Sequence, residues 1–412
     1  MTPVIKRRVE QFQHGEVPEG YKKTKVGVVP NDWYEDSLGK YLREFKKLSN
    51  DIDSYPVYSS SRQGLIPQSQ YYDKREAVET NLGYKVVPNE YVTYRHMSDD
   101  DIFHFNINET GGEILVSSEY PVFTSSSKGE LGFIIPMLNG TARFRYFCRT
   151  QKMGGTRTRL YYKNLCAYKA AFPSLIEQKK IAEILSAQDK LITLKEKFIE
   201  EKRRRKKALM QQLLTGRKRL SGFSEKWVDV KLGDVFAERV ETNCQELQLL
   251  SVTGVNGVIP RSMIEIKDNS SEDKSKYLKI CKGDIGYNTM RMWQGVSALS
   301  EHEGIVSPAY TILIPSETIS AKYFSYLFKM HAVIFLFYRF SQGIVDDTRS
   351  LKYHEFAKLH LKVPSDKQEQ EAIARILSVA DKEIEILQKD LDQEKQKKKA
   401  LMQLLLTGIV RV

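Results

Sequence analysis

The chain has 412 residues, 41% of them hydrophobic and 10% aromatic, which excludes a disordered protein and leaves room for two or three domains. Its 64 Lys and Arg outnumber its 52 Asp and Glu, and the net charge of +12 favours a polyanionic partner, nucleic acid before an acidic membrane. Four scattered cysteines without a CxxC pair argue against a zinc site or a disulfide framework, and the absence of a signal-type segment or a long apolar run predicts a cytoplasmic protein with no membrane partner.

Residues 1–172 are expected to form the first globular domain. Short β-branched and aromatic runs such as "YVTYRHM" (91–97) and "GFIIPML" (132–138) are broken by Gly, Pro and Ser clusters, a pattern typical of strands. The domain is therefore predicted to be α/β or α+β.

Residues 173–220 are expected to form a long helix. The stretch "EQKKIAEILSAQDKLITLKEKFIEEKRRRKKALMQQLLTG" (177–216) has no internal Pro or Gly and ends in Thr-Gly, a common helix stop. Its stripe of spacings three and four includes Ile181, Ile184, Gln188, Ile192 and Ile199.

Residues 221–363 repeat the first domain, and residues 364–412 repeat the helix. The run "AYTILIP" (309–315) predicts a strand, whereas residues 321–340 fit either helices or buried strands. The last stretch, "EQEAIARILSVADKEIEILQKDLDQEKQKKKALMQLLLTG" (369–408), aligns without a gap to residues 177–216, with about half of the positions identical.

The two helices are expected to pack on each other. About forty residues make a rod of roughly 60 Å, and an apolar stripe of that length cannot be buried by one helix alone. The apolar stripe of the second copy is formed by Ile373, Ile376, Ala380, Ile384, Leu387 and Leu391. An antiparallel coiled coil would bury both stripes. The predicted fold is thus two globular domains and two long paired helices, related by a pseudo-twofold internal repeat.

No catalytic constellation is recognisable. The chain lacks a GxxxxGK[ST] phosphate loop, GxSxG and HExxH, so no catalytic residue and no metal ligand is predicted. His96 and His104 are better explained as ordinary polar residues than as metal ligands. Acidic residues in "PSDKQEQEAI" (364–373) are explained by helix capping and the helix dipole.

Two variable domains, each followed by a nearly identical helix, resemble the specificity (S) subunit of Type I restriction-modification systems. The resemblance rests on "EQKKIAEIL" and "EQEAIARIL", on both "LLTG" ends, on the Leu-Gly pairs that follow Trp33 and Trp227, and on the two "TR" elements. Together these elements cover nearly the whole chain in the order of that family.

The resemblance implies a target recognition domain for each half of a bipartite, asymmetric site in double-stranded DNA, with the helices as a spacer. It also implies two methyltransferase (M) subunits docked on the helices and restriction (R) subunits that join for cleavage. S-adenosylmethionine, ATP and Mg would serve those partners, so this chain is expected to bind no cofactor and to be no enzyme.

Candidate DNA contacts follow from the residue types that read base edges and phosphates. In the first domain they are Ser60, Arg62, Gln63, Arg95, His96, Arg143, Arg145 and Arg157. In the second domain they are Thr253, Asn256, Asn288, Arg291, Trp293, Gln294 and Arg349. Core packing of Trp293, simple turns at residues 59–64 and 253–257, and internal ion pairs of the arginines remain open as alternatives.

Two other functions remain open at this point. A free-standing repressor could use the same duplicated domains, and a neighbouring adenine methyltransferase gene would argue against it. A self-contained nuclease would need a catalytic cluster, and metal-dependent cutting by the chain alone would reveal one.

Overall fold

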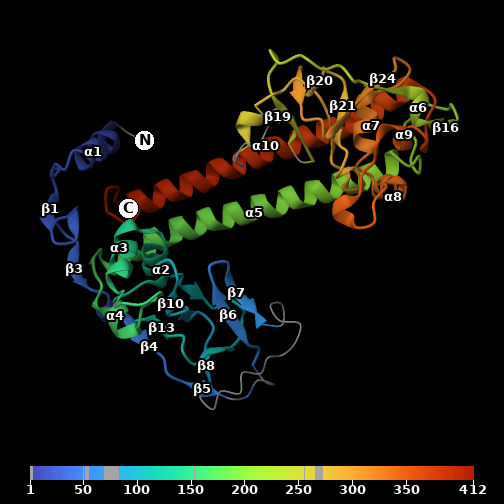
Figure 1. Ribbon diagram of the computed structural model, residues 1–412. Helices are drawn as coiled ribbons and strands as arrows, with labels where there is room; N and C mark the ends of the chain where they lie inside the picture. Colours follow the sequence, from blue (N-terminus) through green and yellow to red (C-terminus); the bar gives the residue numbers. More distant parts are fainter. Residues whose placement is uncertain are drawn as a thin grey trace. The chain divides into compact units, whose positions relative to one another are not determined.

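The computed structural model describes residues 3–49, 51, 55–68, 83–152, 154–254, 256–264 and 272–412, and it combines helices with short antiparallel strands (Figure 1). The chain divides into two compact units: unit 1 comprises Met1–Glu196 with Asp390–Val412, and unit 2 comprises Lys197–Lys389. The division falls within both long helices, α5 (Leu175–Leu213) and α10 (Lys367–Leu405), so each unit contains a segment of each helix.

Unit 1 is built on a four-stranded antiparallel sheet with the order β11-β9-β13-β4. Its central strand pairs place Val92 opposite Phe123 and Ile107. The strands of this sheet are β4 (Leu42–Glu44), β9 (Val92–Thr93), β11 (Asn106–Ile107) and β13 (Val122–Ser125). The other strands are β1 (Tyr21–Thr24), β2 (Gly27–Pro30), β3 (Tyr34–Ser37), β5 (Leu48–Ser49), β6 (Tyr58–Ser61), β7 (Gly64–Pro67), β8 (Tyr84–Val87), β10 (Met97–Ser98), β12 (Ile114–Ser117), β14 (Thr158–Arg159) and β15 (Lys169–Phe172).

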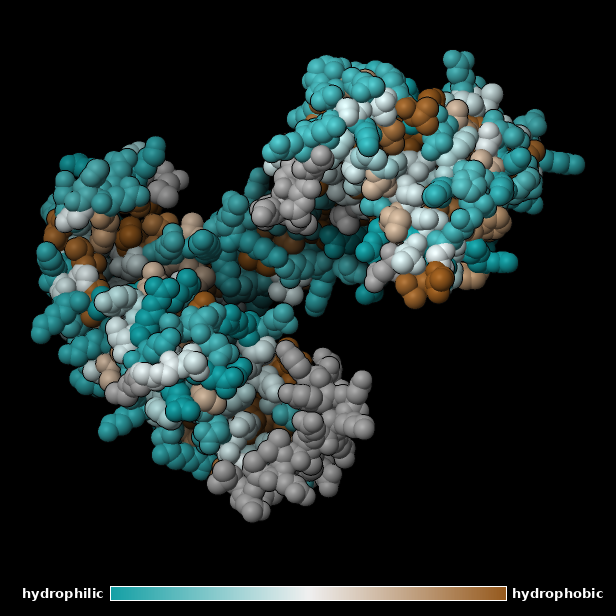
Figure 2. Space-filling view, viewed as in Figure 1, coloured by the Kyte–Doolittle hydropathy of each residue, from teal (hydrophilic) through white to brown (hydrophobic). Residues whose placement is uncertain are grey.

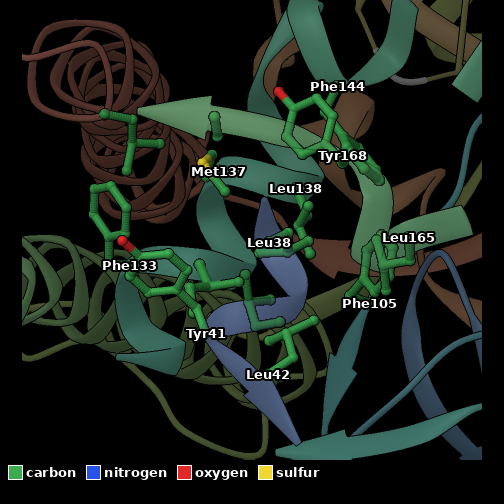
Figure 3. Packing of buried hydrophobic residues seen from close by; sticks show 14 of the residues in the cluster. Leu38, Tyr41, Leu42, Phe105, Phe133, Met137, Leu138, Phe144, Leu165 and Tyr168 are labelled. Carbon is green, nitrogen blue, oxygen red and sulfur yellow. The ribbon is translucent and has the colours of Figure 1, made fainter. Parts of the chain in front are cut away.

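Helices cover this sheet and close the core of unit 1. They are α2 (Leu131–Gly140), α3 (Ala142–Thr150) and α4 (Tyr162–Ala167), whereas α1 (Pro3–Gln13) has no buried residue and takes no part in this core. Figure 3 shows Phe133 and Leu138 of α2 converging with Leu38 and Phe105 in one apolar cluster. Aromatic rings form much of its contact area, with Phe105 and Phe144 centred 5.7 Å apart. Phe105 of this core stands next to Asn106 of edge strand β11, whose side chain donates to Ser60 of the β6–β7 hairpin.

Unit 2 repeats the same topology. Its four-stranded sheet has the order β17-β24-β21-β22, and these strands correspond to β4, β13, β9 and β11 of unit 1. Phe236, Phe324 and Phe328 fill its core as the aromatic residues of unit 1 do. Its strands are β16 (Trp227–Lys231), β17 (Phe236–Glu238), β18 (Leu250–Thr253), β19 (Gly257–Pro260), β20 (Leu278–Ile280), β21 (Ile285–Asn288), β22 (Ser297–Leu299), β23 (Gly304–Val306), β24 (Tyr310–Pro315) and β25 (His360–Pro364). Its helices are α6 (Leu232–Val235), α7 (Ala321–Leu327), α8 (His331–Phe340) and α9 (Tyr353–Phe356).

Two stretches of the sequence fold as helices although their patterns also fitted strands. The strand predicted for residues 132–138 is wrong: this run lies in α2, where Glu130 accepts a hydrogen bond from the backbone N–H of Gly132 at 3.2 Å. A short apolar run fits a buried helix as well as a buried strand, which is why its pattern misled. Residues 321–340, for which both structures fitted, form helices α7 and α8.

The long helices run antiparallel within each unit, as the repeat predicts. In unit 1, Lys195 Nζ lies 2.6 Å from Asp390 Oδ2, and Gln188 Nε2 donates to Glu394 Oε2 at 2.7 Å. In unit 2, Lys206 forms a close ion pair with Asp381. Buried stripe residues such as Ile181, Ile199, Ile373 and Leu391 complete the seam.

A buried glutamate in the first turn of each long helix receives an arginine from beyond the end of the other helix. Glu177 is 5% exposed and lies 2.6 Å from Arg411, which also binds Asp32. Glu369 is fully buried and lies 2.7 Å from Arg219. These are equivalent positions of the repeat, so each unit is closed by the same contact.

The glycine just beyond the end of each long helix packs against a tryptophan side chain. Gly408 and Gly216 have φ angles of +74° and +69°, a left-handed conformation that favours glycine. A Cβ on Gly408 would lie 3.2 Å from Trp33, and one on Gly216 would lie 3.3 Å from Trp227. The Thr-Gly ending of the repeat is therefore required by both conformation and space.

Replacement of Arg219 by alanine is expected to destabilise unit 2 by about 3 kcal/mol, because the buried carboxylate of Glu369 loses its cation. Arg411→Ala should cost about 1 kcal/mol less, since the indole N–H of Trp33 still donates to Glu177 at 3.2 Å. Urea unfolding of the full-length variants measures both changes in free energy. A larger loss for Arg411→Ala would contradict this account.

Candidate nucleic-acid interface

The predicted residues near the β6–β7 hairpin lie at one edge of unit 1. Arg62 and Gln63 form the exposed turn, and the Arg62 guanidinium hydrogen-bonds Asp100 and lowers the pKa of that carboxyl. Ser60 is only 5% exposed, and its Oγ accepts a hydrogen bond from Asn106 Nδ2 at 2.7 Å. Ser60 therefore ties the hairpin to the sheet, while the turn residues face solvent.

Arg95 and His96 follow strand β9 with opposite orientations. Arg95 is exposed, whereas the His96 ring is 3% exposed and lies against Tyr161 with ring centroids 5.6 Å apart. Burial lowers the pKa of His96, although Glu119 Oε2 lies 3.7 Å from Nε2 and acts in the other direction. His96 is therefore a neutral, inward-facing group near neutral pH.

Four of the predicted residues line one hollow of about 550 Å³ in unit 1. Ser60, Arg62, Arg95 and His96 line it, and Asp99 on its wall holds Arg157 through a 2.8 Å ion pair. The structure thus brings together five of the predicted residues of the first domain.

Two predicted arginines lie elsewhere in unit 1. Arg143 and Arg145 are exposed on α3 and do not line this hollow. Arg143 Nη2 donates to the carbonyl of Lys25 at 3.2 Å, which ties α3 to the N-terminal segment.

The β18–β19 hairpin of unit 2 occupies the position of the β6–β7 hairpin. Thr253 Oγ1 donates to the carbonyl of Gly257 at 2.9 Å and accepts from the backbone N–H of Asn256 at 2.9 Å. Its threonine hydroxyl therefore builds the turn, and the exposed Asn256 side chain is left at the tip. Thr253 and Asn256 both line a hollow of about 1120 Å³ in unit 2.

The segment after β21 carries the other predicted residues of unit 2. Asn288 Oδ1 accepts a hydrogen bond from the backbone N–H of Met290 at 3.0 Å, which starts a turn into the 3-10 helix Met292–Gln294. Arg291 and Gln294 are exposed on this turn. Trp293 is half-buried, and its indole N–H donates to the carbonyl of Met290 at 3.0 Å.

Tyr338 of α8 links Trp293 to Arg349. The Trp293 and Tyr338 rings are centred 6.0 Å apart, and the Arg349 guanidinium lies 4.1 Å above the Tyr338 ring. Arg349 Nε also lies 2.8 Å from Asp346 Oδ1. Arg349 Nη2 also donates to the Tyr338 hydroxyl at 2.9 Å, and a guanidinium with these two acceptors keeps further N–H groups for a third.

Sequence reasoning missed Tyr338 and Lys329. Tyr338 lies near the end of the apolar run 321–340. Its ring belongs to the candidate site only because the fold places it against Trp293 and Arg349. Lys329 had one signal in the sequence: it is a lysine within the most apolar part of the stretch 321–340, whereas Lys322 stands near the start of that stretch. The basic run 202–207 is partly committed to α10, because Lys202 and Lys206 form ion pairs with Glu383 and Asp381.

Other kinds of site would require metal ligands, reactive cysteines or membrane-spanning helices among the described residues. No group of three His, Cys, Asp or Glu side chains in the described ranges is placed to hold a metal ion. Cys148 is buried, whereas the other three free cysteines are partly exposed. Helices long and apolar enough to cross a bilayer are absent from the part of the chain that the structure describes. Figure 2 shows hydrophilic residues over most of the visible face, with smaller apolar patches over each unit.

Comparison with known proteins agrees with the duplicated architecture. Residues 43–202 and 224–395 match the family described as the Type I restriction modification DNA specificity domain. Two proteins of Methanocaldococcus jannaschii are similar over 96% of this chain: the putative type I restriction enzyme MjaX specificity subunit, at 24% identity over 97% of its length, and the type I restriction enzyme MjaVIII specificity subunit, at 23% identity over 96%. The crystal structure of the S subunit of the Type I restriction-modification system of M. genitalium shares the fold, with a TM-score of 0.57, 14% identity, and coverage of 90% of this chain and 96% of that one.

The chain is therefore a DNA specificity protein with two recognition domains. It belongs to the Type I restriction modification DNA specificity domain family, whose matches occupy both repeats. The prediction of a specificity subunit rather than an enzyme is confirmed by this membership.

Arg157 and Arg349 occupy equivalent "TR" elements, and each alanine variant tests whether they contact phosphate. We expect each variant to weaken binding equally on all DNA sequences and to reduce the slope of log K against log salt by about 1, because one phosphate contact is lost. Titrations at several salt concentrations measure this slope. An unchanged slope would assign the two side chains to their internal ion pairs with Asp99 and Asp346.

Proposed function

We propose that each unit reads one half of a bipartite, asymmetric site in double-stranded DNA, and that the paired helices set the spacing of the two halves. The observation that carries this proposal is the recurrence of one sheet topology with different residues on matching loops. Arg62 and Gln63 stand on the hairpin turn in unit 1, where unit 2 carries Asn256. A duplicated scaffold with different reading residues favours two half-sites of different sequence.

The helices are suited to act as a spacer. Each has 39 residues. Such a helix is about 58 Å long, more than one turn of duplex DNA at about 34–36 Å. The antiparallel ion pairs and the buried Glu–Arg contacts resist sliding of one helix along the other, so the spacing would be a fixed property of the chain.

The helices also support docking of two methyltransferase subunits. Apolar side chains remain exposed at equivalent positions of the repeat: Ile184 and Leu194 on α5 are 36% and 64% exposed, and Ile376 and Ile386 on α10 are 37% and 57% exposed. We call these two pairs the helix patches. One patch belongs to unit 1 and the other to unit 2, which favours two copies of one partner.

Catalysis would then belong to the partners. The methyltransferase subunits would supply S-adenosylmethionine chemistry, and restriction subunits would supply cleavage with ATP and Mg, while this chain holds no cofactor. A free-standing repressor remains the second candidate, but a repressor would not need exposed apolar residues at matching positions of the two helices. The helix patches therefore favour a scaffold.

Exchange of residues 20–172 for the corresponding domain of a relative with a different target tests the division between half-sites. We expect one half-site to change and the other, with the spacer length, to be retained. Methylation-aware sequencing of DNA from cells that carry the chimera and its methyltransferase identifies the modified sites. Alteration of both halves would contradict the proposal.

Leu194→Asp and Ile386→Asp test the helix patches separately. Each variant is expected to weaken the binding of one methyltransferase subunit by about 10- to 100-fold, because a charge replaces an apolar contact. Native mass spectrometry should give one bound subunit for each single variant and none for the double variant. Val240→Asp is the matched control, since Val240 is 70% exposed but lies outside the long helices. Two subunits on the double variant would rule out docking at these patches.

A further inference from the structure

Lys329 lies in the short link between α7 and α8 of unit 2 and points its ammonium at backbone carbonyls. Its Nζ lies 2.7 Å from the carbonyl oxygen of Gly295 and 2.6 Å from that of Ser297. A third carbonyl, of Gly254, is 3.5 Å away. These distances are those of charge-assisted hydrogen bonds for the first two oxygens and of a weaker contact for the third.

The three carbonyls belong to the loops that carry the candidate DNA contacts. Gly295 has a φ angle of +78° and ends the 3-10 helix that contains Trp293. Ser297 begins strand β22, and Gly254 lies in the β18–β19 turn between Thr253 and Asn256. One side chain therefore holds both loops against the helices behind the sheet.

Partial burial makes this lysine sensitive to loss of its acceptors. Desolvation lowers the pKa of Lys329 to about 8, and the side chain lies in the wall of the hollow that also contains Thr253 and Asn256. Among the described residues its hydrogen-bond acceptors are backbone carbonyls, and no carboxylate is paired with it. Lys329 is half-buried, and a partly desolvated ammonium without a counter-ion is stabilised by fixed dipoles that replace water, so the loop carbonyls and the ammonium hold each other in place.

Unit 1 has a different group at the equivalent position. Asn139 lies near the end of α2, as Lys329 follows α7, and Phe105 precedes edge strand β11, as Ser297 begins edge strand β22. Asn139 Oδ1 accepts from the backbone N–H of Phe105 at 2.9 Å, and its Nδ2 donates to the carbonyl of Phe105 at 3.0 Å. In both units, a side chain from the helix pair thus binds the backbone at the start of the edge strand. This group is the Asn139 amide in unit 1 and the Lys329 ammonium in unit 2.

We propose that Lys329 is a positioning residue for base recognition, which sets the place of the Met292–Gln294 turn and of the β18–β19 turn and so determines how sharply unit 2 discriminates its half-site. This inference rests on the proposed reading of one half-site by each unit. Lys329 acts through Arg291, Gln294 and Asn256, and needs no contact with DNA itself.

The test uses the full chain assembled with its methyltransferase subunits. Methylation rates are measured on DNA with the recognised site and with every single-base change in each half-site. We expect Lys329→Met to reduce discrimination in the unit 2 half-site by about tenfold and to leave the other half-site unchanged, since misplaced side chains lose base-edge hydrogen bonds. Lys329→Arg, which can still donate to the carbonyls, should restore discrimination to within about twofold of the original chain. The unit 2 half-site is the one that the exchange of residues 20–172 leaves intact.

Lys322→Met is the matched control, because this lysine of α7 has a side chain 44% exposed and contacts no loop carbonyl among the described residues. Unchanged discrimination in Lys329→Met, or an equal loss in both half-sites, would overturn the inference. If Lys329→Met does not assemble, Lys329→Gln compared with Lys329→Arg decides between the same outcomes. An original chain that discriminates in neither half-site would instead refute the proposed function, whatever the variants do.

Discussion

The structure depends on a buried carboxylate that neither repeat can neutralise by itself. Glu177 and Glu369 stand in the first turns of the long helices, and their cations, Arg411 and Arg219, come from beyond the end of the opposite helix. A buried, unpaired carboxylate is strongly destabilising, so each helix requires the other in antiparallel orientation. The neighbouring glutamines add to this constraint: Gln178 donates to the carbonyl of Pro173 at 3.1 Å, and Gln370 donates to that of Pro364 at 2.9 Å. The "EQ" pair therefore anchors each helix both to the strand before it and to the tail of its partner.

Much of the helical framework could be predicted because it depends on local patterns. The Thr-Gly ends, the stripe and the antiparallel pairing follow from periodicity and from duplication. The predicted apolar stripe is wider than the buried seam, however, because Ile184 and Ile376 are more than one third exposed. A two-helix seam buries a narrower strip than an amphipathic surface helix does, and residues at its margin stay accessible. Helix capping likewise explains Asp366, which accepts from the backbone N–H of Gln368, but not Glu369, whose role depends on a residue 150 positions away.

The candidate site was predictable at the level of loops and less so at the level of side chains. Both hairpin turns and the segment after β21 carry exposed polar residues, as their composition suggests. Ser60 and His96 turn inward because Asn106, Glu119 and Tyr161 surround them, and these neighbours come from other parts of the chain. The same reason hides Tyr338 and Lys329 from sequence reasoning, because each acquires its role from segments that only the tertiary fold brings near.

The discontinuity of unit 1 sets the order in which the chain can fold during synthesis. Unit 2 is a single stretch, Lys197–Lys389, and is complete once its last residue has left the ribosome. Unit 1 also needs Asp390–Val412, and the contact between Asp32 and Arg411 spans 379 positions. The N-terminal part of unit 1 must therefore wait for residues 390–412, and until then the first turn of α5 exposes Glu177 and an uncovered apolar seam. A chain truncated after residue 389 would retain all of unit 2 but would lack the part of α10 and the arginine that close unit 1.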